Sequence, residues 1–321
     1  METLDKTAAA HTDGKQNGSG QFEVPKVKRP NLEDMDLSTG KKARLYRLLY
    51  EHGPGNGTML LLPIDQGLEH GPIDFLTNSA ALDPEFQLKL ALDGGFSGIV
   101  FHIGLATKYM NKYAGKVPLV LKINGKTNVP SDAQAFSALD ATVEDAVRLG
   151  ADAIGYTLYV GSPRQDQDFL QFNHVRLECE KYGMPIIMWA YPRGEAMKAK
   201  GGNDSLYAVD YAARVALELG ADVVKLNVPD YEKLSSDQPK PYNEMDLGYA
   251  GSVSKVVASA GRAMVLFSGG SKVSDEDLMT KARTTIENGA TGLIFGRNLW
   301  QRPMDQALAI TEKMLKMMRE S

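Results

Sequence analysis

Two lysines stand inside short apolar runs, where a charged side chain is unexpected. Lys225 lies within 223–226 and Lys122 within 119–123. Lysine is seldom buried without a reason, and burial lowers the pKa of its ammonium group, which frees the amine to attack a carbonyl carbon. Each lysine could instead extend to solvent or pair with a carboxylate. The spacing alone does not choose between the two as a nucleophile.

Groups suited to proton transfer and anion binding follow other apolar runs. Asp65 comes directly after one run, where its carboxylate would orient a substrate hydroxyl, hold a cation, or only cap the next helix. Trp189 and Tyr191 are two residues apart and so face the same way along a strand, and Arg193 follows at the same parity. Together they offer an apolar wall, a phenol and a cation. An aromatic pair by itself is more typical of a packed core.

Glycine-rich turns after the last two apolar runs predict a phosphate site. Ser268, Gly269 and Gly270 let backbone N–H groups approach an anion, and Gly296 with Arg297 adds a fixed positive charge. A pair of glycines alone would indicate only a tight turn. Phosphate sites commonly form from the loops after strands seven and eight of an eight-stranded barrel.

The elements that must position these residues alternate regularly along the chain. Eight apolar runs have the length and composition of strands buried on both faces: 58–64, 98–103, 119–123, 153–158, 185–189, 223–226, 264–267 and 292–295. Segments with apolar residues at helical spacing lie before, between and after them: 41–51, 85–92, 143–149, 206–219, 275–288 and 304–318.

A helix–glycine–strand joint recurs four times, at Gly94, Gly150, Gly220 and Gly289. Such a repeat favours an α/β fold of repeated β/α units, and eight strands match a (β/α)8 TIM barrel better than the alternative, an open doubly wound sheet. In a barrel the chemistry lies at the carboxyl ends of the strands. We therefore expect the polar residues named above to converge there.

Composition sets the remaining expectations. The chain of 321 residues has ordinary globular content and a net charge of −4, which argues against nucleic acid as a partner. It holds no apolar run long enough to cross a membrane and no signal-peptide core, and its one cysteine excludes an internal disulfide. We expect a cytoplasmic protein with a mobile or loosely ordered polar tail over 1–40 and a catalytic barrel over 41–321.

Metal and dinucleotide chemistry have little support in the sequence. The five histidines are scattered without zinc-binding spacing, so no metal site is predicted. No Gly-x-Gly-x-x-Gly follows the first strand, which argues against a dinucleotide cofactor.

Six motifs in order give the chain a family resemblance: Asp65-Gln66-Gly67 with Glu69-His70-Gly71-Pro72, Gly155-Tyr156-Thr157-Leu158-Tyr159, Trp189-Ala190-Tyr191-Pro192-Arg193-Gly194, Gly220-Ala221-Asp222-Val223-Val224-Lys225, Ser268-Gly269-Gly270 and Gly296-Arg297-Asn298-Leu299-Trp300-Gln301. The chain resembles the archaeal-type class I fructose-bisphosphate aldolases, a family that also occurs in bacteria. The resemblance runs from about residue 60 to residue 302.

The resemblance implies a role for each motif residue. Lys225, rather than Lys122, matches the lysine that forms the Schiff base, and Tyr191 matches the tyrosine that shuttles a proton. Asp65 and Trp189 match residues that position the substrate, and Arg193 and His70 match positions at the far end of the sugar. The residues that match the binding site for the phosphate on C1 are Ser268, Gly269, Gly270, Gly296 and Arg297. Gln66, also expected to bind substrate, stands beside Asp65 where relatives often carry histidine, which is a departure from the family's pattern.

The resemblance also implies the reaction, a reversible cleavage of fructose 1,6-bisphosphate without metal or organic cofactor, in glycolysis or gluconeogenesis. A homo-oligomer, a decamer in the family, is implied as well. The alternatives are a sister enzyme acting on another phosphorylated sugar, such as an aminodideoxyheptulosonate synthase or an enzyme that processes a phosphorylated signalling sugar, and a sensor that binds sugar phosphates without turnover. A sensor would lose Lys225 or Tyr191, and both are present.

Overall fold

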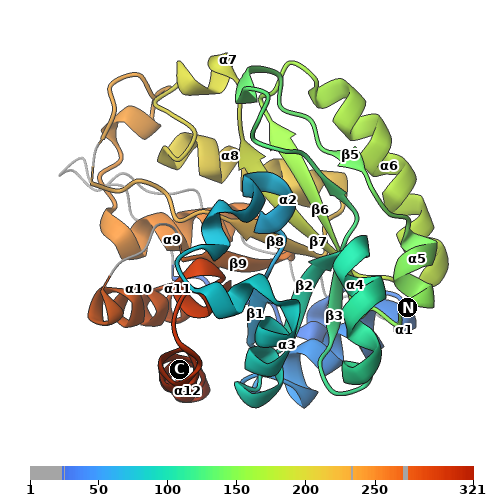
Figure 1. Ribbon diagram of the computed structural model, residues 1–321. Coiled ribbons are helices and arrows are strands. Elements are labelled where there is room, and N and C mark those ends of the chain that lie inside the picture. The colour runs from blue at the N-terminus through green and yellow to red at the C-terminus, as the bar shows by residue number, and fades with distance from the viewer. Residues whose placement is uncertain (1–23, 25, 233, 270–273) are drawn as a thin grey trace, which may run out of the picture.

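Eight parallel strands close into a barrel in the computed structural model (Figure 1), which describes residues 24, 26–232, 234–269 and 274–321. Each strand pairs with its neighbour in sequence, and the last pairs with the first. The strands are β1 (Met59–Pro63), β2 (Gly98–His102), β3 (Leu119–Lys122), β6 (Ala153–Val160), β7 (Ile186–Pro192), β8 (Val223–Leu226), β9 (Met264–Ser268) and β10 (Gly292–Ile294). All eight predicted strands are confirmed, and the predicted TIM barrel with them.

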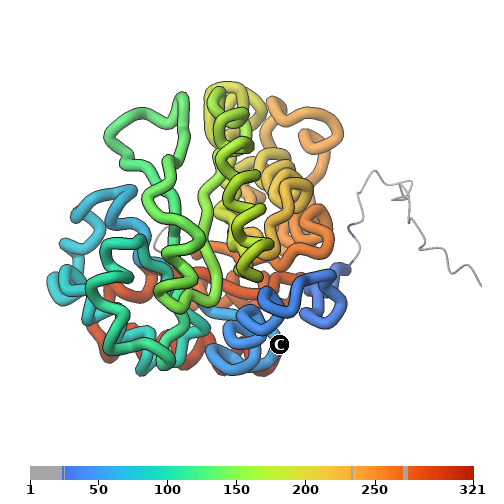
Figure 2. The backbone as a smooth tube through the Cα atoms, turned by 90° about the vertical axis from the view of Figure 1, so that its right-hand side faces the viewer, coloured from blue at the N-terminus to red at the C-terminus, as the bar shows by residue number. Residues whose placement is uncertain are grey.

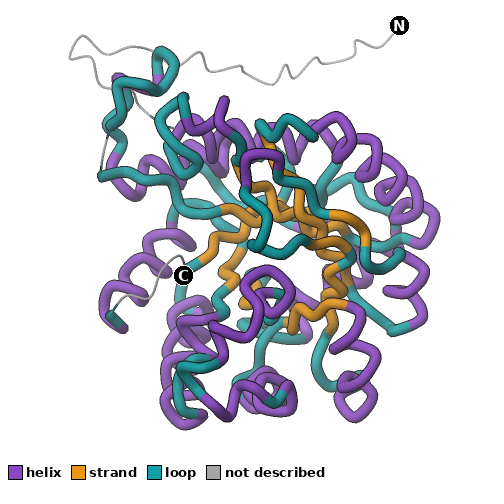
Figure 3. The backbone as a smooth tube through the Cα atoms, turned by 45° about the horizontal axis from the view of Figure 1, so that its top comes forward, coloured by secondary structure: helices purple, strands orange, loops and turns teal. Residues whose placement is uncertain are grey.

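Helices surround the barrel as an outer layer (Figure 3). The longer ones are α3 (Pro84–Asp93), α6 (Gln165–Tyr182), α8 (Leu206–Leu219), α9 (Gly248–Ser259), α10 (Asp275–Glu287) and α12 (Met304–Arg319). Shorter ones are α1 (Thr39–Tyr46), α2 (Gln66–His70), α4 (Ile103–Tyr109), α5 (Val143–Arg148), α7 (Glu195–Lys198) and α11 (Arg297–Trp300). Gly150 and Gly220, at the predicted joints, have φ of 67° and 96°, which is the left-handed conformation that closes a helix.

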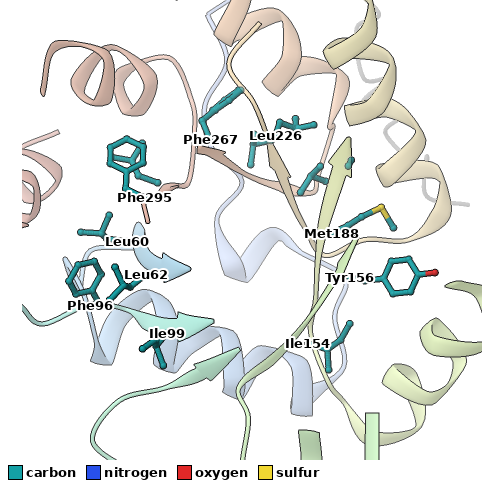
Figure 4. Close-up of a cluster of buried hydrophobic side chains, with 14 of the residues drawn as sticks. Leu60, Leu62, Phe96, Ile99, Ile154, Tyr156, Met188, Leu226, Phe267 and Phe295 are labelled. Carbon is teal, nitrogen blue, oxygen red and sulfur yellow. The ribbon is translucent and has the colours of Figure 1, made fainter. Parts of the chain in front are cut away.

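Alternation along the strands separates two hydrophobic layers. Leu60 and Leu62 of β1 point outward to the helices, as do Met188 and Leu226 (Figure 4). The intervening Met59 and Leu61 point into the barrel, in one cluster with Ile187, Trp189 and Val223. Because side chains alternate along a strand, Lys225 shares the inward direction of Val223. The register of β8 thus turns Lys225 toward the barrel axis.

The N-terminal segment closes the lower end of the barrel (Figure 2). Leu32 and Met35 beside the short helix η1 (Leu32–Asp34) are buried, and with Leu45 and Leu48 they belong to the cluster inside the barrel. The expected loose tail up to residue 40 therefore ends earlier, because these apolar side chains cover the inner face of the strands. Residues 1–23 lie outside the described residues.

Lys41 of α1 is the buried polar centre of this closure. Its Nζ donates hydrogen bonds to Glu180 and to Asp222, lies 3.0 Å from Asp222 Oδ2, and is only 2% exposed. Asp222 also accepts a hydrogen bond of 2.8 Å from the backbone N–H of Ile186. The ion pair ties the N-terminal helix to the ends of α6 and β8.

We expect Lys41→Met to destabilise the fold by about 3–5 kcal/mol, because it leaves the buried carboxylate of Asp222 without its cation. Urea unfolding followed by circular dichroism measures the loss. Lys42→Met is the matched control, since Lys42 is partly exposed and its nearest carboxylate, on Glu33, is 4.0 Å away; a change below about 1 kcal/mol is expected there. Equal losses in the two variants would contradict the assigned role of Lys41.

Candidate active site

A cavity of about 610 Å³ opens at the carboxyl ends of the strands. It is lined by eleven of the twelve residues that the sequence singles out: Asp65, Gln66, His70, Trp189, Tyr191, Arg193, Lys225, Ser268, Gly269, Gly296 and Arg297. The twelfth, Gly270, lies outside the described residues. The barrel thus brings together residues that are up to 232 positions apart, since Asp65 and Arg297 face one space.

Lys225 and Tyr191 form the reactive pair of this cavity. Lys225 Nζ contacts the hydroxyl of Tyr191 from the neighbouring strand β7 and lies 4.3 Å from the centre of the tyrosine ring. Burial lowers the pKa of Lys225 to about 8; the carboxylates of Asp65 and Glu69 oppose this shift, and the charge of Lys122 adds to it. At pH 7 about a tenth of an amine with this pKa is unprotonated, far more than of an ordinary lysine, and the amine sits within reach of a proton carrier.

The pKa of Lys225 predicts the acid limb of the activity profile. A lysine acts as a nucleophile only when it is unprotonated, so below a pKa of about 8 the reactive fraction falls as the proton concentration rises. We expect kcat/KM to fall about tenfold per pH unit below that pKa. The measurement is kcat/KM from about pH 6 to about pH 10, which reports the free enzyme. A profile that stays flat through this range would contradict an amine nucleophile with a depressed pKa.

Lys122 occupies a different environment, although it is also buried. Its Nζ donates hydrogen bonds to Thr157 Oγ1 (2.7 Å) and to the carbonyl oxygen of Asn124 (3.1 Å), and it lies 5.1 Å from the Trp189 ring centre. It is absent from the lining of the main cavity, which Lys225 shares. The geometry therefore favours Lys225 over Lys122 as the nucleophile, a choice that the sequence spacing left open.

Asp65 lies beside Lys122 and lines the cavity of Lys225 rather than serving as a helix cap. It occupies the N-cap position of α2, yet its side chain makes no capping hydrogen bond. Its Oδ2 is 3.8 Å from Lys122 Nζ, and the residue is 8% exposed. A buried carboxylate beside one lysine and facing the cavity of the other is placed to orient a hydroxyl group.

At the predicted phosphate end, Gly269 and Gly296 lie so close to their neighbours that neither position has room for a side chain. A Cβ on Gly269 would come within 2.9 Å of the Phe295 ring, and one on Gly296 within 2.9 Å of the Pro63 carbonyl oxygen. Ser268 Oγ donates a hydrogen bond of 2.8 Å to Asn227 Oδ1. Asn227, directly after β8, also lines the cavity and is a site residue to which the sequence motifs assign no role.

A second cation lies beside the predicted far end. Arg193 Nε lies 3.2 Å from Asp132 Oδ2, and Lys126 Nζ lies 2.8 Å from Oδ1 of the same carboxylate. Arg193 lines the main cavity, whereas Lys126 lines a small adjoining cavity that shares Asp65 and Glu69 with it. The resemblance implies a role for Arg193 but not for Lys126, whose place four residues after the end of β3 is the signal that could have found it.

His70 has a different neighbour from the one that its predicted role suggests. Its Nδ1 is 2.6 Å from Asp74 Oδ2, and the same oxygen is 3.8 Å from Arg297 Nη1. Through Asp74, His70 is thus linked to the arginine of the predicted phosphate end, whereas Arg193 pairs with Asp132. The predicted contact of His70 with the far end of the sugar stays a prediction.

The family model described as DeoC/LacD family aldolase matches residues 59–302. This match starts at the first residue of β1 and extends past β10 and α11, so it covers the whole barrel.

The chain belongs to the DeoC/LacD aldolase family.

Relatives of this DeoC/LacD aldolase carry a common name. The class 1 fructose-bisphosphate aldolase of Thermoproteus tenax is 40% identical over 247 residues, which cover 77% of this chain and 84% of that protein. The protein of the same name from Halobacterium salinarum is 37% identical over 247 residues, covering 77% and 86%. Both matches take in most of each protein.

A solved structure of similar fold bears on the nucleophile. It is an archaeal fructose-1,6-bisphosphate aldolase whose catalytic lysine is covalently bound to the carbinolamine intermediate of the substrate. Its TM-score to this DeoC/LacD aldolase is 0.72 at 35% identity, covering 86% of this chain and 99% of that one.

The described residues of this DeoC/LacD aldolase contain neither a metal-binding cluster nor a membrane-spanning helix. Among the described residues, no group of three or more histidine, cysteine, aspartate or glutamate side chains is arranged to hold a metal ion. No helix in the described part of the chain is both long and apolar enough to span a membrane.

Proposed function

We propose that this chain is a class I fructose-bisphosphate aldolase that cleaves fructose 1,6-bisphosphate reversibly to dihydroxyacetone phosphate and glyceraldehyde 3-phosphate. The observation that carries the proposal is the buried Lys225, whose amine contacts the Tyr191 hydroxyl inside a cavity with cationic groups at Arg297 and Arg193. A ketose with a phosphate at each end complements a central amine flanked by two cationic ends.

The reaction begins with the amine of Lys225. It adds to the C2 carbonyl of the open-chain ketose, and loss of water from the resulting carbinolamine leaves a protonated imine. Removal of the C4 hydroxyl proton then breaks the C3–C4 bond, and the electron pair moves into the imine to give an enamine. Glyceraldehyde 3-phosphate leaves as the aldehyde. Protonation of the enamine at C3 and addition of water release dihydroxyacetone phosphate and restore Lys225.

The cavity residues have distinct parts in this scheme. Tyr191 carries protons to and from the reacting atoms, because its hydroxyl already contacts the amine that forms the imine. Asp65 orients the substrate hydroxyls, and Trp189 forms the apolar wall beside the sugar chain. Ser268 and Arg297, with the neighbouring glycines, hold the phosphate on C1.

Borohydride trapping tests the proposal. The protein is incubated with dihydroxyacetone phosphate, reduced, digested and mapped by mass spectrometry, and we expect an adduct on Lys225. An adduct on Lys122 would keep imine chemistry and contradict the assignment of the nucleophile. A folded protein without any adduct would overturn the proposal. Cleavage of fructose 1,6-bisphosphate, followed by release of the triose phosphates, then separates this aldolase from sister enzymes with other substrates.

We also infer that the chain forms a homo-oligomer. Large apolar side chains that lie exposed near the start of the barrel support this inference: Ile73 is 66%, Leu76 is 67% and Leu82 is 55% exposed. Exposed apolar surface of this kind is typical of protein interfaces. Sedimentation velocity measures the mass in solution, and a monomer at micromolar concentration would contradict the inference.

A further inference from the structure

One carboxylate bridges Arg193, which lines the far end of the cavity, and Lys126, which lines a small adjoining cavity that shares Asp65 and Glu69 with it. Asp132 Oδ1 is 2.8 Å from Lys126 Nζ, and Asp132 Oδ2 is 3.2 Å from Arg193 Nε. Each oxygen therefore serves one cation. The side chains of Lys126 and Arg193 are only 12% and 18% exposed, whereas that of Asp132 is 39% exposed. The two cations are thus mostly buried, and their shared counterion is the more exposed partner.

Asp132 is carried by a segment outside the barrel. It starts the short helix η6 (Asp132–Gln134), between the two-residue strands β4 (Asn124–Gly125) and β5 (Ala138–Leu139). This part of the chain is the green loop projecting at the upper edge of Figure 2, and its Val129 is 92% exposed. A backbone hydrogen bond of 2.8 Å from Asn128 to the Glu69 carbonyl oxygen joins it to α2. Ser162 Oγ donates a hydrogen bond of 2.6 Å to the Ala135 carbonyl oxygen, so the segment is anchored on both sides of Asp132 while Asp132 itself stays partly exposed.

The carboxylate of Asp132 occupies the position between Lys126 and Arg193 where another anion could bind. Burial alone would raise the pKa of Asp132, but hydrogen bonds and charge from Lys126 and Arg193 outweigh it and lower that pKa. A phosphate group carries more negative charge than a carboxylate and has three oxygens with which to accept hydrogen bonds from an arginine and a lysine together. It is therefore a stronger partner for the same two cations.

We propose that Asp132 is a specificity-determining residue, an internal counterion that the distal phosphate of the substrate displaces from Lys126 and Arg193. The inference rests on the proposed function, because it takes the distal group to be the C6 phosphate of fructose 1,6-bisphosphate. A substrate that ends in a neutral hydroxyl cannot replace a carboxylate between two cations. It leaves the bridge closed and gains nothing from either cation.

Removing the charge of Asp132 separates the two kinds of substrate. Asp132→Asn keeps the size of the side chain and leaves both cations without their counterion. Because partly exposed ion pairs are weak, the competition that Asp132 offers is modest, and we expect KM for fructose 1,6-bisphosphate to fall about three- to tenfold. For fructose 1-phosphate, which lacks the distal phosphate, kcat/KM is expected to stay within about twofold of wild type. Asp305→Asn, an exposed carboxylate on α12, controls for the change in net charge.

Two outcomes would overturn the inference. A higher KM for fructose 1,6-bisphosphate in Asp132→Asn would mean that Asp132 positions the cations for the substrate instead of competing with it. Equal shifts for the two substrates would mean that the effect does not depend on the distal phosphate. The selective fall in KM supports the displacement.

A binding measurement keeps this test apart from the test of the proposed function. In a Lys225→Met background, which cannot form an imine, calorimetry measures the affinity for fructose 1,6-bisphosphate with and without Asp132→Asn. Tighter binding in the double variant supports the role of Asp132, and equal or weaker binding contradicts it. A wild-type protein that neither cleaves the sugar nor forms an adduct would overturn the proposed function alone, since the calorimetric comparison does not need turnover.

Discussion

Replacing Lys225 with methionine is expected to lower kcat for fructose 1,6-bisphosphate cleavage on the order of 10⁴- to 10⁶-fold, as removal of a covalent nucleophile does elsewhere. Methionine keeps the apolar stem of the side chain, which lies inside the barrel, and removes the amine that attacks the ketone. The variant should therefore fold. Steady-state kinetics and borohydride trapping are the measurements, and the trapped adduct should be absent.

Lys122→Met is the matched control for this variant. Lys122 is a second buried lysine near the site, but its amine is bonded to Thr157 and Asn124 and does not line the main cavity. Its variant should still give the adduct on Lys225. Substantial activity in Lys225→Met, or loss of the adduct only in Lys122→Met, would contradict the assignment.

Replacing Tyr191 with phenylalanine is expected to lower kcat about 10²- to 10⁴-fold, the range for removal of a general acid–base group. The ring stays in place, so the wall of the cavity and the amine of Lys225 are preserved. Dihydroxyacetone phosphate should consequently still be trapped on Lys225 by borohydride, although more slowly. This combination separates proton transfer from imine formation.

Tyr159→Phe provides the neighbouring control. Tyr159 pairs directly with Tyr191 across β6 and β7 and is equally a tyrosine near the strand ends. Among the described residues, no hydrogen bond joins Tyr159 to Lys225, whose amine contacts Tyr191 instead. The Tyr159→Phe variant should therefore retain kcat within about tenfold of wild type, as expected for a group that transfers no proton. Similar losses in the two tyrosine variants would argue against a specific proton carrier at Tyr191.

The strands and the strand-end residues could be predicted because they are local properties of the chain. A run such as 223–226 is short, apolar and closed on both sides by glycine or polar residues, so its burial follows from composition. Alternation then fixes that Lys225 and Trp189 face inward. Parallel strands bring all their carboxyl ends to one side, which gathers the site without any knowledge of contacts.

Other features depend on contacts that no local pattern carries. The bridge from Asp132 to Arg193 joins residues 61 positions apart, and its segment is polar and exposed, as in any loop. The strands β4 and β5 have two residues each, too few for a period. The burial of Leu32 depends on the open lower end of the barrel, which exists only once the strands have closed. The sequence likewise could not show that His70 pairs with Asp74 rather than with another nearby carboxylate.

The closure of the barrel by its N-terminal segment has a consequence for folding during synthesis. Lys41 emerges early from the ribosome, but its partner Asp222 follows 181 residues later. Until then the lysine keeps its charge in water, and the apolar side chains of the same segment have no barrel to enter. At about 5–20 residues per second, the interval is on the order of ten to forty seconds. The N-terminal segment is therefore made first but is among the last parts of the chain to reach its final place. Until then its apolar side chains stay exposed to water and to other proteins in the cell.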